Sequence, residues 1–434
     1  MNEKHEQTAW YETLTVKLII LGFMTLALLI PLQLIQMIIR EREASSNDVV
    51  TSISDQWGRQ QTITGPVLNL PVYRVVELKE GKSNIERDTW HILPEKLDIS
   101  GKIDPQIRYR GIYEAVIYDS NLEISGSFIL PDGRHDNYQV AWEEAYFTMG
   151  ISDNRGLRDT VVMNAGGRII DAIPGVYDQQ LFLSGITFPA NFAAPGESFP
   201  FRIDLGLRGS GGIYFSPAGK TTTVKIESGW KAPSFAGSFL PDNRQIDETG
   251  FSSEWVVTHL NRNFPQQWTG EYEGFSSDTF GVDLILEVDH YLKSERSAKY
   301  GILFIALTFM VLLYLELTSS GKIHVFSYFL VGLALVLFFS LLNSLSEHTG
   351  FSLAYTISSV ATISLVTLFT KSQVEGAKTV IVVGGMLTIL YAFIFVLLAL
   401  KDYAYLAGNI GLFVALGAIM YISARTKAFK NSTL

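Results

Sequence analysis

The stretch VKLIILGFMTLALLIPLQLIQMII, residues 16–39, decides the class of this protein. Its one charged residue, Lys17, stands close to its start. About 20 consecutive apolar residues are enough for a helix to cross a hydrocarbon core of about 30 Å. The charged sequence REREASS follows directly and does not resemble the small-residue cleavage site of a signal peptide. We therefore expect an uncleaved membrane-spanning helix, within which Pro31 can be tolerated.

Five further apolar runs follow near the C-terminal end of the chain, at residues 301–315, 325–342, 351–369, 379–400 and 404–422. The segments that connect them are short, as is usual between antiparallel neighbours in a helix bundle. The sequence therefore predicts six transmembrane helices, five of them in a bundle over residues 300–422.

The charges of the short loops predict the orientation of these helices. Basic residues gather on one side of the predicted membrane, at Lys4, Lys17, Lys322, Lys371, Lys378, Arg425, Lys427 and Lys430, whereas the short loops on the other side carry only Lys401. Positive charge in short loops is typical of the cytoplasmic side. We expect a cytoplasmic N-terminus at residues 1–15 and a cytoplasmic tail at residues 423–434.

Residues 40–297, between the first and second predicted helices, have a sequence pattern typical of a β domain. Apolar and polar residues alternate at 113–130, 201–209, 221–230 and 280–292, with turn signals between such stretches. Many short strands at this spacing predict a large β-sandwich-like domain on the outer side. Residues 138–150 fit a helix and a strand almost equally well, and the choice between them stays open.

The composition excludes several classes of function. Residues 41–300 hold 24 Lys and Arg against 36 Asp and Glu, and this acidity disfavours nucleic acid as a partner. The chain has no Cys, so thiolate metal sites and Cys nucleophiles are excluded. The Gly-Lys-Thr at 219–221 lacks the earlier Gly of a phosphate-binding loop, because position 214 is Tyr, and we interpret it as a turn.

The histidines of the external domain give no metal-binding pattern. His91, His135, His259 and His290 lack the spacing of a zinc site, and we expect isolated surface histidines. No Gly-x-Ser-x-Gly motif supports a serine hydrolase. We expect a protein that is not an enzyme, with no catalytic residue, metal or cofactor.

Two polar residues of the predicted helices are functional candidates. Glu316 lies at the expected inner end of the second helix, where a charge in lipid would cost several kcal/mol, and we expect it at the interface. Asn343 ends the third apolar run and could hydrogen-bond to a neighbouring helix.

Glu347 and His348 form a further candidate pair, placed between the third and fourth predicted helices. One interpretation is the solvated tip of a hairpin, in which neither side chain matters. The other is that the pair, together with Asn343, docks this loop against the external domain or neighbouring helix ends. An imidazole gains charge as pH falls past neutrality, so that contact would respond to acidity.

The chain resembles the CreD family of bacterial inner-membrane, cell-envelope integrity proteins. The resemblance is carried by GPVLNLPVY (65–73), YRGIYEAVIY (109–118), ISDNRGL (151–157), WKAPSFAGSFLP (230–241), FGVDLILEVDHYLKSERSAKYGILFIALTF (280–309) and YFLVGLALVLFFSLLNSLSEHTGF (328–351). One departure is local, since Val325-Phe326-Ser327 stand where the family tends to have Pro-Val-Gln. The resemblance implies an inner-membrane protein linked to envelope stress or integrity, with its β domain in the periplasm. It supplies no catalytic residue.

Two hypotheses for the function result from these observations. In the first, the periplasmic domain binds or monitors an envelope component and the helices anchor it in the lipid bilayer. In the second, the helix bundle acts as a carrier or handles lipid. The identity of the ligand or protein partner cannot be deduced from these residues.

Overall fold

The computed structural model describes residues 14–78, 82–132, 138–190, 198–270, 272, 278–286, 290–318, 323–373 and 377–400, with scattered residues between 406 and 420. These residues fall into two compact units. The helical unit comprises residues 1–45 and 288–434, and the β unit comprises residues 46–287.

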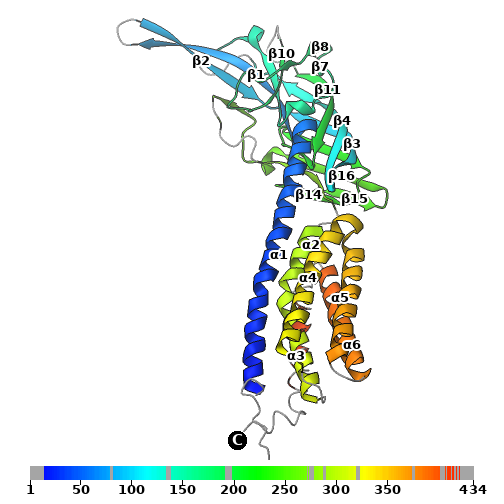
Figure 1. Ribbon diagram of the computed structural model, residues 1–434. Helices are drawn as coiled ribbons and strands as arrows, with labels where there is room; N and C mark the ends of the chain where they lie inside the picture. Colours follow the sequence, from blue (N-terminus) through cyan, green and yellow to red (C-terminus); the bar gives the residue numbers. More distant parts are fainter. Residues whose placement is uncertain are drawn as a thin grey trace, which may run out of the picture. The chain divides into compact units, whose positions relative to one another are not determined.

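The helices are α1 (Leu14–Trp57), α2 (His290–Lys299), α3 (Gly301–Thr318), α4 (Val325–Thr349), α5 (Phe351–Gln373) and α6 (Ala377–Ala399). Helix α1 continues to Trp57, well beyond the predicted end of the first span at Ile39 (Figure 1). Residues 40–57 contain no Gly or Pro, and the helix ends where Gly58 takes a positive φ of 143°. The apolar run therefore predicted the start of this helix but not its end.

Four of the described helices, α1, α4, α5 and α6, are long and apolar enough to cross a membrane. Helices α2 and α3 meet at a bend of 40° and would make a fifth span if they count as one. The predicted sixth span at 404–422 lies largely outside the described residues. The structure thus supports several spans, and the number six stays a prediction.

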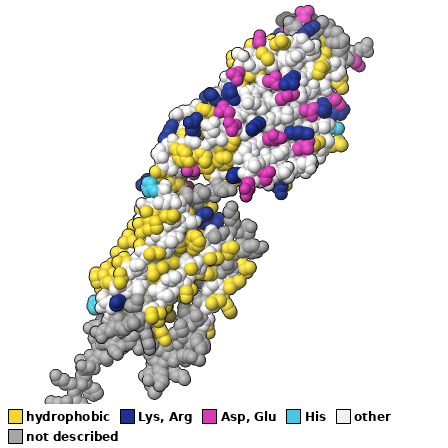
Figure 2. All heavy atoms as spheres, turned by 90° about the vertical axis from the view of Figure 1, so that its right-hand side faces the viewer, with side chains coloured by type: hydrophobic (Ala, Val, Ile, Leu, Met, Phe, Trp, Pro, Cys, Tyr) yellow, Lys and Arg dark blue, Asp and Glu magenta, His cyan; other side chains and the backbone are white. Residues whose placement is uncertain are grey.

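The helical unit has an apolar core and an apolar surface. Leu28, Phe304 and Phe338 are among its buried side chains, whereas Ile19 and Phe23 of α1 are largely exposed. Many hydrophobic side chains and few charged ones lie on the visible described surface of this unit, whereas charged side chains gather on the β unit (Figure 2). An exposed apolar surface of this kind is what lipid requires of a membrane-spanning helix.

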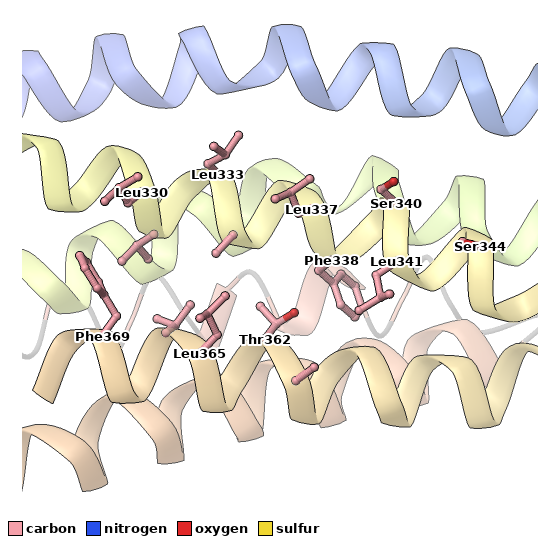
Figure 3. A pocket seen from close by; sticks show the side chains of 14 residues that line it. Leu330, Leu333, Leu337, Phe338, Ser340, Leu341, Ser344, Thr362, Leu365 and Phe369 are labelled. Atoms are coloured by element: carbon pink, nitrogen blue, oxygen red, sulfur yellow. The ribbon is translucent and has the colours of Figure 1, made fainter.

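Close packing joins α1 to α4. A Cβ atom placed on Gly332 of α4 would lie 2.2 Å from Cδ1 of Leu28, so a larger residue would push the two helices apart. Helices α4 and α5 are separated only by Gly350, whose positive φ of 81° permits the sharp reversal of the chain. Between α4 and α5 an apolar groove opens, lined by residues of both helices (Figure 3).

The described strands form two sheets. They are β1 (Gln61–Leu78), β2 (Lys82–Ile92), β3 (Lys96–Arg110), β4 (Tyr113–Ile129), β5 (Gln139–Val140), β6 (Tyr146–Ile151), β7 (Val162–Ala165), β8 (Arg168–Asp171), β9 (Ile173–Pro174), β10 (Gly185–Pro189), β11 (Ser198–Ser210), β12 (Gly212–Phe215), β13 (Thr221–Ser228), β14 (Pro233–Gly237), β15 (Asn243–Asp247), β16 (Gly250–Thr258), β17 (Gln267–Thr269) and β18 (Phe280–Leu284). One sheet runs in the order β14-β18-β12-β1-β6-β10-β9, with β2, β5 and β17 attached to it. The other runs β15-β16-β13-β3-β4-β11-β7-β8.

The two sheets share one hydrophobic core, to which Phe147 of β6 and Val224 of β13 both belong. Burial alternates along β11 and β13, as expected for strands with one face against that core. Strands β1 and β2 also form a long ribbon that extends away from the rest of the β unit (Figure 1). The β unit is therefore a two-sheet sandwich with a protruding hairpin.

The structure decides the one segment that the sequence left open, corrects a second and confirms a third. Residues 138–150 contain two strands, β5 and most of β6, separated by a short 3-10 turn at Trp142–Glu144. The predicted strand at 280–292 stops at Leu284, and His290 begins α2. The Gly-Lys-Thr segment lies in a turn that leads into β13, as predicted, where the backbone N–H of Gly219 donates to Thr222 Oγ1 at 2.9 Å.

Candidate functional site

A buried ion pair joins three helices of the helical unit. Lys17 of α1 pairs with Oε1 of Glu316, near the C-terminal end of α3. The hydroxyl of Tyr328, in the first turns of α4, donates to Oε2 of the same carboxylate at 2.9 Å. The Glu316 side chain is 5% exposed and that of Lys17 is 18% exposed. Both carboxylate oxygens therefore have donors within the protein.

Glu316 was expected at the membrane interface, and no partner for it could be predicted from the sequence. The structure supplies the partner, Lys17, and buries the carboxylate among α1, α3 and α4. Removing one member of a buried pair leaves a charge without compensation, which is more costly than the pair itself. The pair therefore fixes the start of α1 against α3 and α4.

Asn343, Glu347 and His348 lie in the last turns of α4, which extends to Thr349. The prediction of a loop is therefore wrong for Glu347 and His348, whereas Asn343 lies in the helix, as expected. Asn343 is buried, and among the described residues its Oδ1 has no hydrogen-bond partner. The Glu347 carboxylate lies 3.5 Å from the hydroxyl of Tyr291 on α2. His348 is exposed. The structure therefore directs Glu347 toward α2 and leaves the proposed docking of His348 as a prediction.

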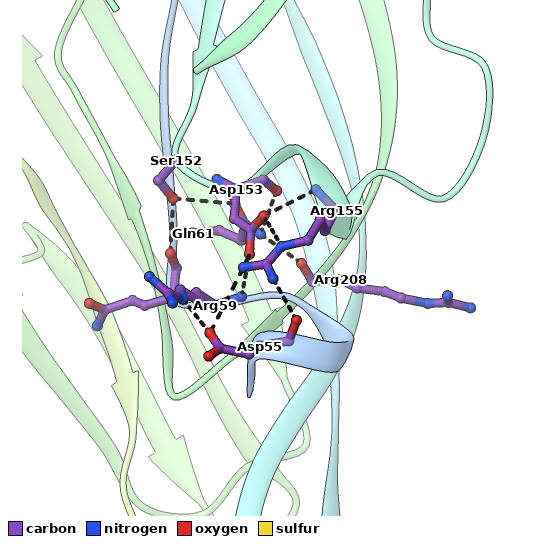
Figure 4. Close-up of polar contacts among 8 residues, drawn as sticks. Asp55, Arg59, Gln61, Ser152, Asp153, Arg155 and Arg208 are labelled. Atoms are coloured by element: carbon purple, nitrogen blue, oxygen red, sulfur yellow. Dashed lines mark hydrogen bonds and ion pairs between the residues drawn. The ribbon is translucent and has the colours of Figure 1, made fainter. Parts of the chain in front are cut away.

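A second charged network surrounds the end of α1 within the β unit (Figure 4). Asp153 is its centre. Oδ1 of Asp153 accepts from the backbone N–H of Arg155 at 3.1 Å and from Nε of Arg155 at 2.9 Å. Oδ2 accepts from Nη2 of Arg155 at 2.9 Å and from the backbone N–H of Arg59 at 3.0 Å. Burial alone would raise the pKa of Asp153, but these hydrogen bonds outweigh it and hold that pKa below its usual value.

The same network holds the last turns of α1. Asp55 pairs with Arg59 across one helical turn, and Nη1 of Arg155 donates to the backbone carbonyl of Asp55 at 2.7 Å. Buried Gln61 donates through Nε2 to the carbonyls of Asp153 at 3.1 Å and Arg208 at 3.0 Å. The segment after α1 is therefore bound to the 152–156 turn and to β11 by both side-chain and backbone atoms.

Trp57, the last residue of α1, completes this attachment. Its indole Nε1 donates to the carbonyl of Tyr118 at 3.2 Å. The guanidinium carbon of Arg208 lies 4.5 Å from the centroid of the Trp57 rings, within the range of a cation–π contact. A Cβ atom on Gly156 would lie 2.3 Å from the carbonyl oxygen of Arg208, so a larger residue there would force the turn away. We call the residues Asp55, Trp57, Arg59, Gln61, Asp153, Arg155 and Arg208 the helix clamp.

The helix clamp was not predicted from the sequence, although Asp153, Arg155 and Gly156 belong to ISDNRGL, one of the motifs that carry the family resemblance. One local signal was available. Asp55 and Arg59 stand four positions apart, the spacing at which charges pair on a helix. Both residues lie beyond Ile39, the predicted end of the first helix, so this spacing did not indicate a helical pair.

The prediction of isolated surface histidines is wrong for His91. Its strand, β2, is flanked by β1 and β17, and its ring packs 5.1 Å from that of Trp268. Nδ1 of His91 lies 2.7 Å from Asn69 Oδ1, and Nε2 lies 3.6 Å from Asp178 Oδ2. Burial lowers the pKa of His91 to about 4. His91 is therefore a neutral core residue at ordinary pH.

Of the remaining histidines of this domain, the structure describes the side chain of His259. His259 is exposed, as predicted, whereas His135 and the side chain of His290 lie outside what the structure describes. Among the described residues, no cluster of three or more His, Asp or Glu side chains could hold a metal ion.

A comparison with known proteins decides the family. The family profile described as "Inner membrane protein CreD" matches residues 13–427. The chain belongs to the CreD family. It is 29% identical over 405 residues to the inner membrane protein CreD of Escherichia coli (strain K12), a match that covers 92% of this chain and 90% of that relative. With its apolar helices, this CreD-family chain is a multi-pass inner-membrane protein.

Proposed function

We propose that this CreD-family protein supports the integrity of the cell envelope without catalysing a reaction. Its β unit would lie in the periplasm and bind or monitor an envelope component. That component, or a periplasmic or membrane protein, would be the partner of the domain. The helices would hold it in the inner membrane, with both chain ends in the cytoplasm. The family and its inner-membrane location support this proposal.

One observation supports the proposal most strongly: α1 is a single helix held by charged contacts near both of its ends. Lys17 near its start pairs with Glu316 inside the helical unit. Asp55, Trp57 and the adjacent Arg59 belong to the helix clamp inside the β unit. A continuous helix of this kind transmits displacement better than a flexible linker does. Binding at the β unit would therefore reach the membrane helices through α1.

The experiment interrupts α1 without touching either set of contacts. Residues 44–46, Ala-Ser-Ser, are replaced by Gly-Gly-Gly in one variant and by Ala-Ala-Ala in the matched control. Each Gly costs about 1 kcal/mol of helix stability relative to Ala, so the first variant weakens the continuity of α1 and the second preserves it. Cells lacking the protein receive each variant and are challenged with detergent and with osmotic stress.

We expect the Ala variant to protect the envelope as the parent does and the Gly variant to fail at equal abundance in the membrane. Full protection by the Gly variant would reject transmission through α1. If cells that lack the protein resisted both stresses as well as the parent strain does, the envelope role itself would be rejected.

A second candidate function is that of a carrier or lipid-handling protein using the helix bundle. The buried pair of Lys17 and Glu316 favours it, because ionisable groups within membrane helices often mark a path for substrate or protons. Transport by the purified protein in liposomes, lost in Glu316→Gln, would support this alternative.

A further inference from the structure

The groove between α4 and α5 has a volume of about 720 Å³ and an almost entirely apolar lining. Buried Phe338 and Val366 lie among its lining residues, as does Thr362 (Figure 3). Leu337 and Leu365 are exposed beside them. The groove is thus an open depression between the two helices, with buried side chains of both helices among its lining.

The dimensions of the groove restrict what can occupy it. Its α4 lining runs from Leu330 to Ser344, which is about 21 Å along a helix axis. The α5 lining runs from Ala361 to Phe369, which is about 12 Å on the same helical rise. The groove is therefore an elongated apolar trough whose length suits an extended chain.

The polarity of the groove changes along its length. The end near Leu330 and Phe369 is apolar, whereas Ser340 and Ser344 line the other end (Figure 3). Exposed His348 follows Ser344 by four positions, which places it on the same face of α4. Because α4 and α5 have the composition of membrane spans, an occupant would enter from hydrocarbon. The arrangement matches an amphipathic molecule with one long apolar chain.

We propose that the α4–α5 groove binds an acyl chain of a membrane phospholipid, with the lipid headgroup at the Ser344 and His348 end. Leu337, Leu341 and Leu365 contact the chain, and Thr362 lies in the floor without blocking it. The hydroxyl of Ser344 and the imidazole of His348 offer donors to a phosphate. This site goes beyond the envelope role proposed above and requires only that α4 and α5 span the membrane.

The test compares two neighbouring substitutions on α5. Ala361 lines the groove, whereas Val360, although exposed, does not. Ala361→Phe places a ring in the groove, and Val360→Phe adds the same ring outside it. The full-length protein in nanodiscs is irradiated with a phospholipid that carries a diazirine in one acyl chain, and the labelled peptides are mapped. Ala334→Leu, on the α4 side of the groove, serves as a second filling variant if Ala361→Phe does not fold.

We expect labelling of the α4 and α5 groove residues to exceed that of exposed α1 positions such as Phe23. It should fall about tenfold in the filling variant and stay within about twofold in Val360→Phe. Equal labelling of all exposed apolar faces, or groove labelling that resists both filling variants, would overturn the site. Equal labelling by a diazirine-bearing diacylglycerol, or by phospholipid in His348→Ala, would overturn the headgroup assignment. None of these results depends on the stress phenotype that tests the envelope role.

Discussion

Among single residues, Glu316 is a buried charge on whose partners the stability of the helical unit depends. Both of its carboxylate oxygens are occupied, one by Lys17 and one by Tyr328. Lys17→Met leaves the carboxylate buried without its cation, and we expect a loss of about 3 kcal/mol, seen as a lower melting temperature of the detergent-purified protein. The double variant Lys17→Met, Glu316→Gln should recover most of this loss, because the amide is neutral and still accepts from Tyr328.

Lys371→Met provides the matched control for this prediction, since Lys371 is an exposed lysine on α5. If Lys17→Met lowered the melting temperature no more than Lys371→Met does, the ion pair would not stabilise the helical unit.

His91 gives a prediction about pH. Burial lowers its pKa to about 4 in the folded protein, against an ordinary value of 6.5. As pH falls below 6.5 the unfolded chain takes up this proton first, so the stability of the fold decreases until pH passes 4. Between pH 7.5 and 5 the decrease should be about 2 kcal/mol in the free energy of unfolding. Urea titrations of residues 46–287 at these two pH values measure it.

In His91→Gln, the decrease in the free energy of unfolding between pH 7.5 and 5 should be smaller by about 2 kcal/mol than in the parent protein. Asp153 does not interfere in this range, because its pKa is lowered and its contribution is lost only at more acidic pH. An unchanged pH dependence in His91→Gln would show that His91 is not the group responsible.

The partners of these residues could not be deduced from the sequence. Lys17 and Glu316 are separated by 299 positions, and no local pattern connects them. The sequence around His91 gives no sign that this side chain is buried. Its burial results from strands β1 and β17, which lie on either side of β2. Long-range pairing of this kind depends on the register of the whole sheet.

At the scale of elements, hydropathy predicted where the described membrane helices begin better than where they end. Helices α3, α4 and α5 begin at Gly301, Val325 and Phe351, where their apolar runs begin. Helices α1 and α4 continue past the ends of their runs, because no Gly or Pro interrupts them there and a polar sequence can continue a helix. Polar candidates such as Glu347 were therefore placed in a loop when they belong to the last turns of α4.

At the scale of the whole molecule, the β unit has its own core and should fold without the helices. Residues 46–287 expressed alone should be soluble, should melt cooperatively and should give a β-type circular dichroism spectrum, since a block of this size can bury a core. A mainly helical spectrum, or a melt without cooperativity, would contradict this independence. The alternation of apolar and polar residues predicted a β domain. It did not predict the order of the strands, in which β1 pairs in parallel with the distant β12.

The β unit is proposed to lie outside the inner membrane, and single cysteines can test this placement in a chain that has none of its own. Gln245 of β15, Thr349 of α4 and Ser372 of α5 are exposed positions for them. Ser346 would be unsuitable because it is buried. Intact cells are treated with a membrane-impermeant maleimide before and after permeabilisation of the inner membrane. We predict that positions 245 and 349 react in intact cells and that position 372 reacts only after permeabilisation. Reaction of position 372 in intact cells, with positions 245 and 349 protected, would contradict the account.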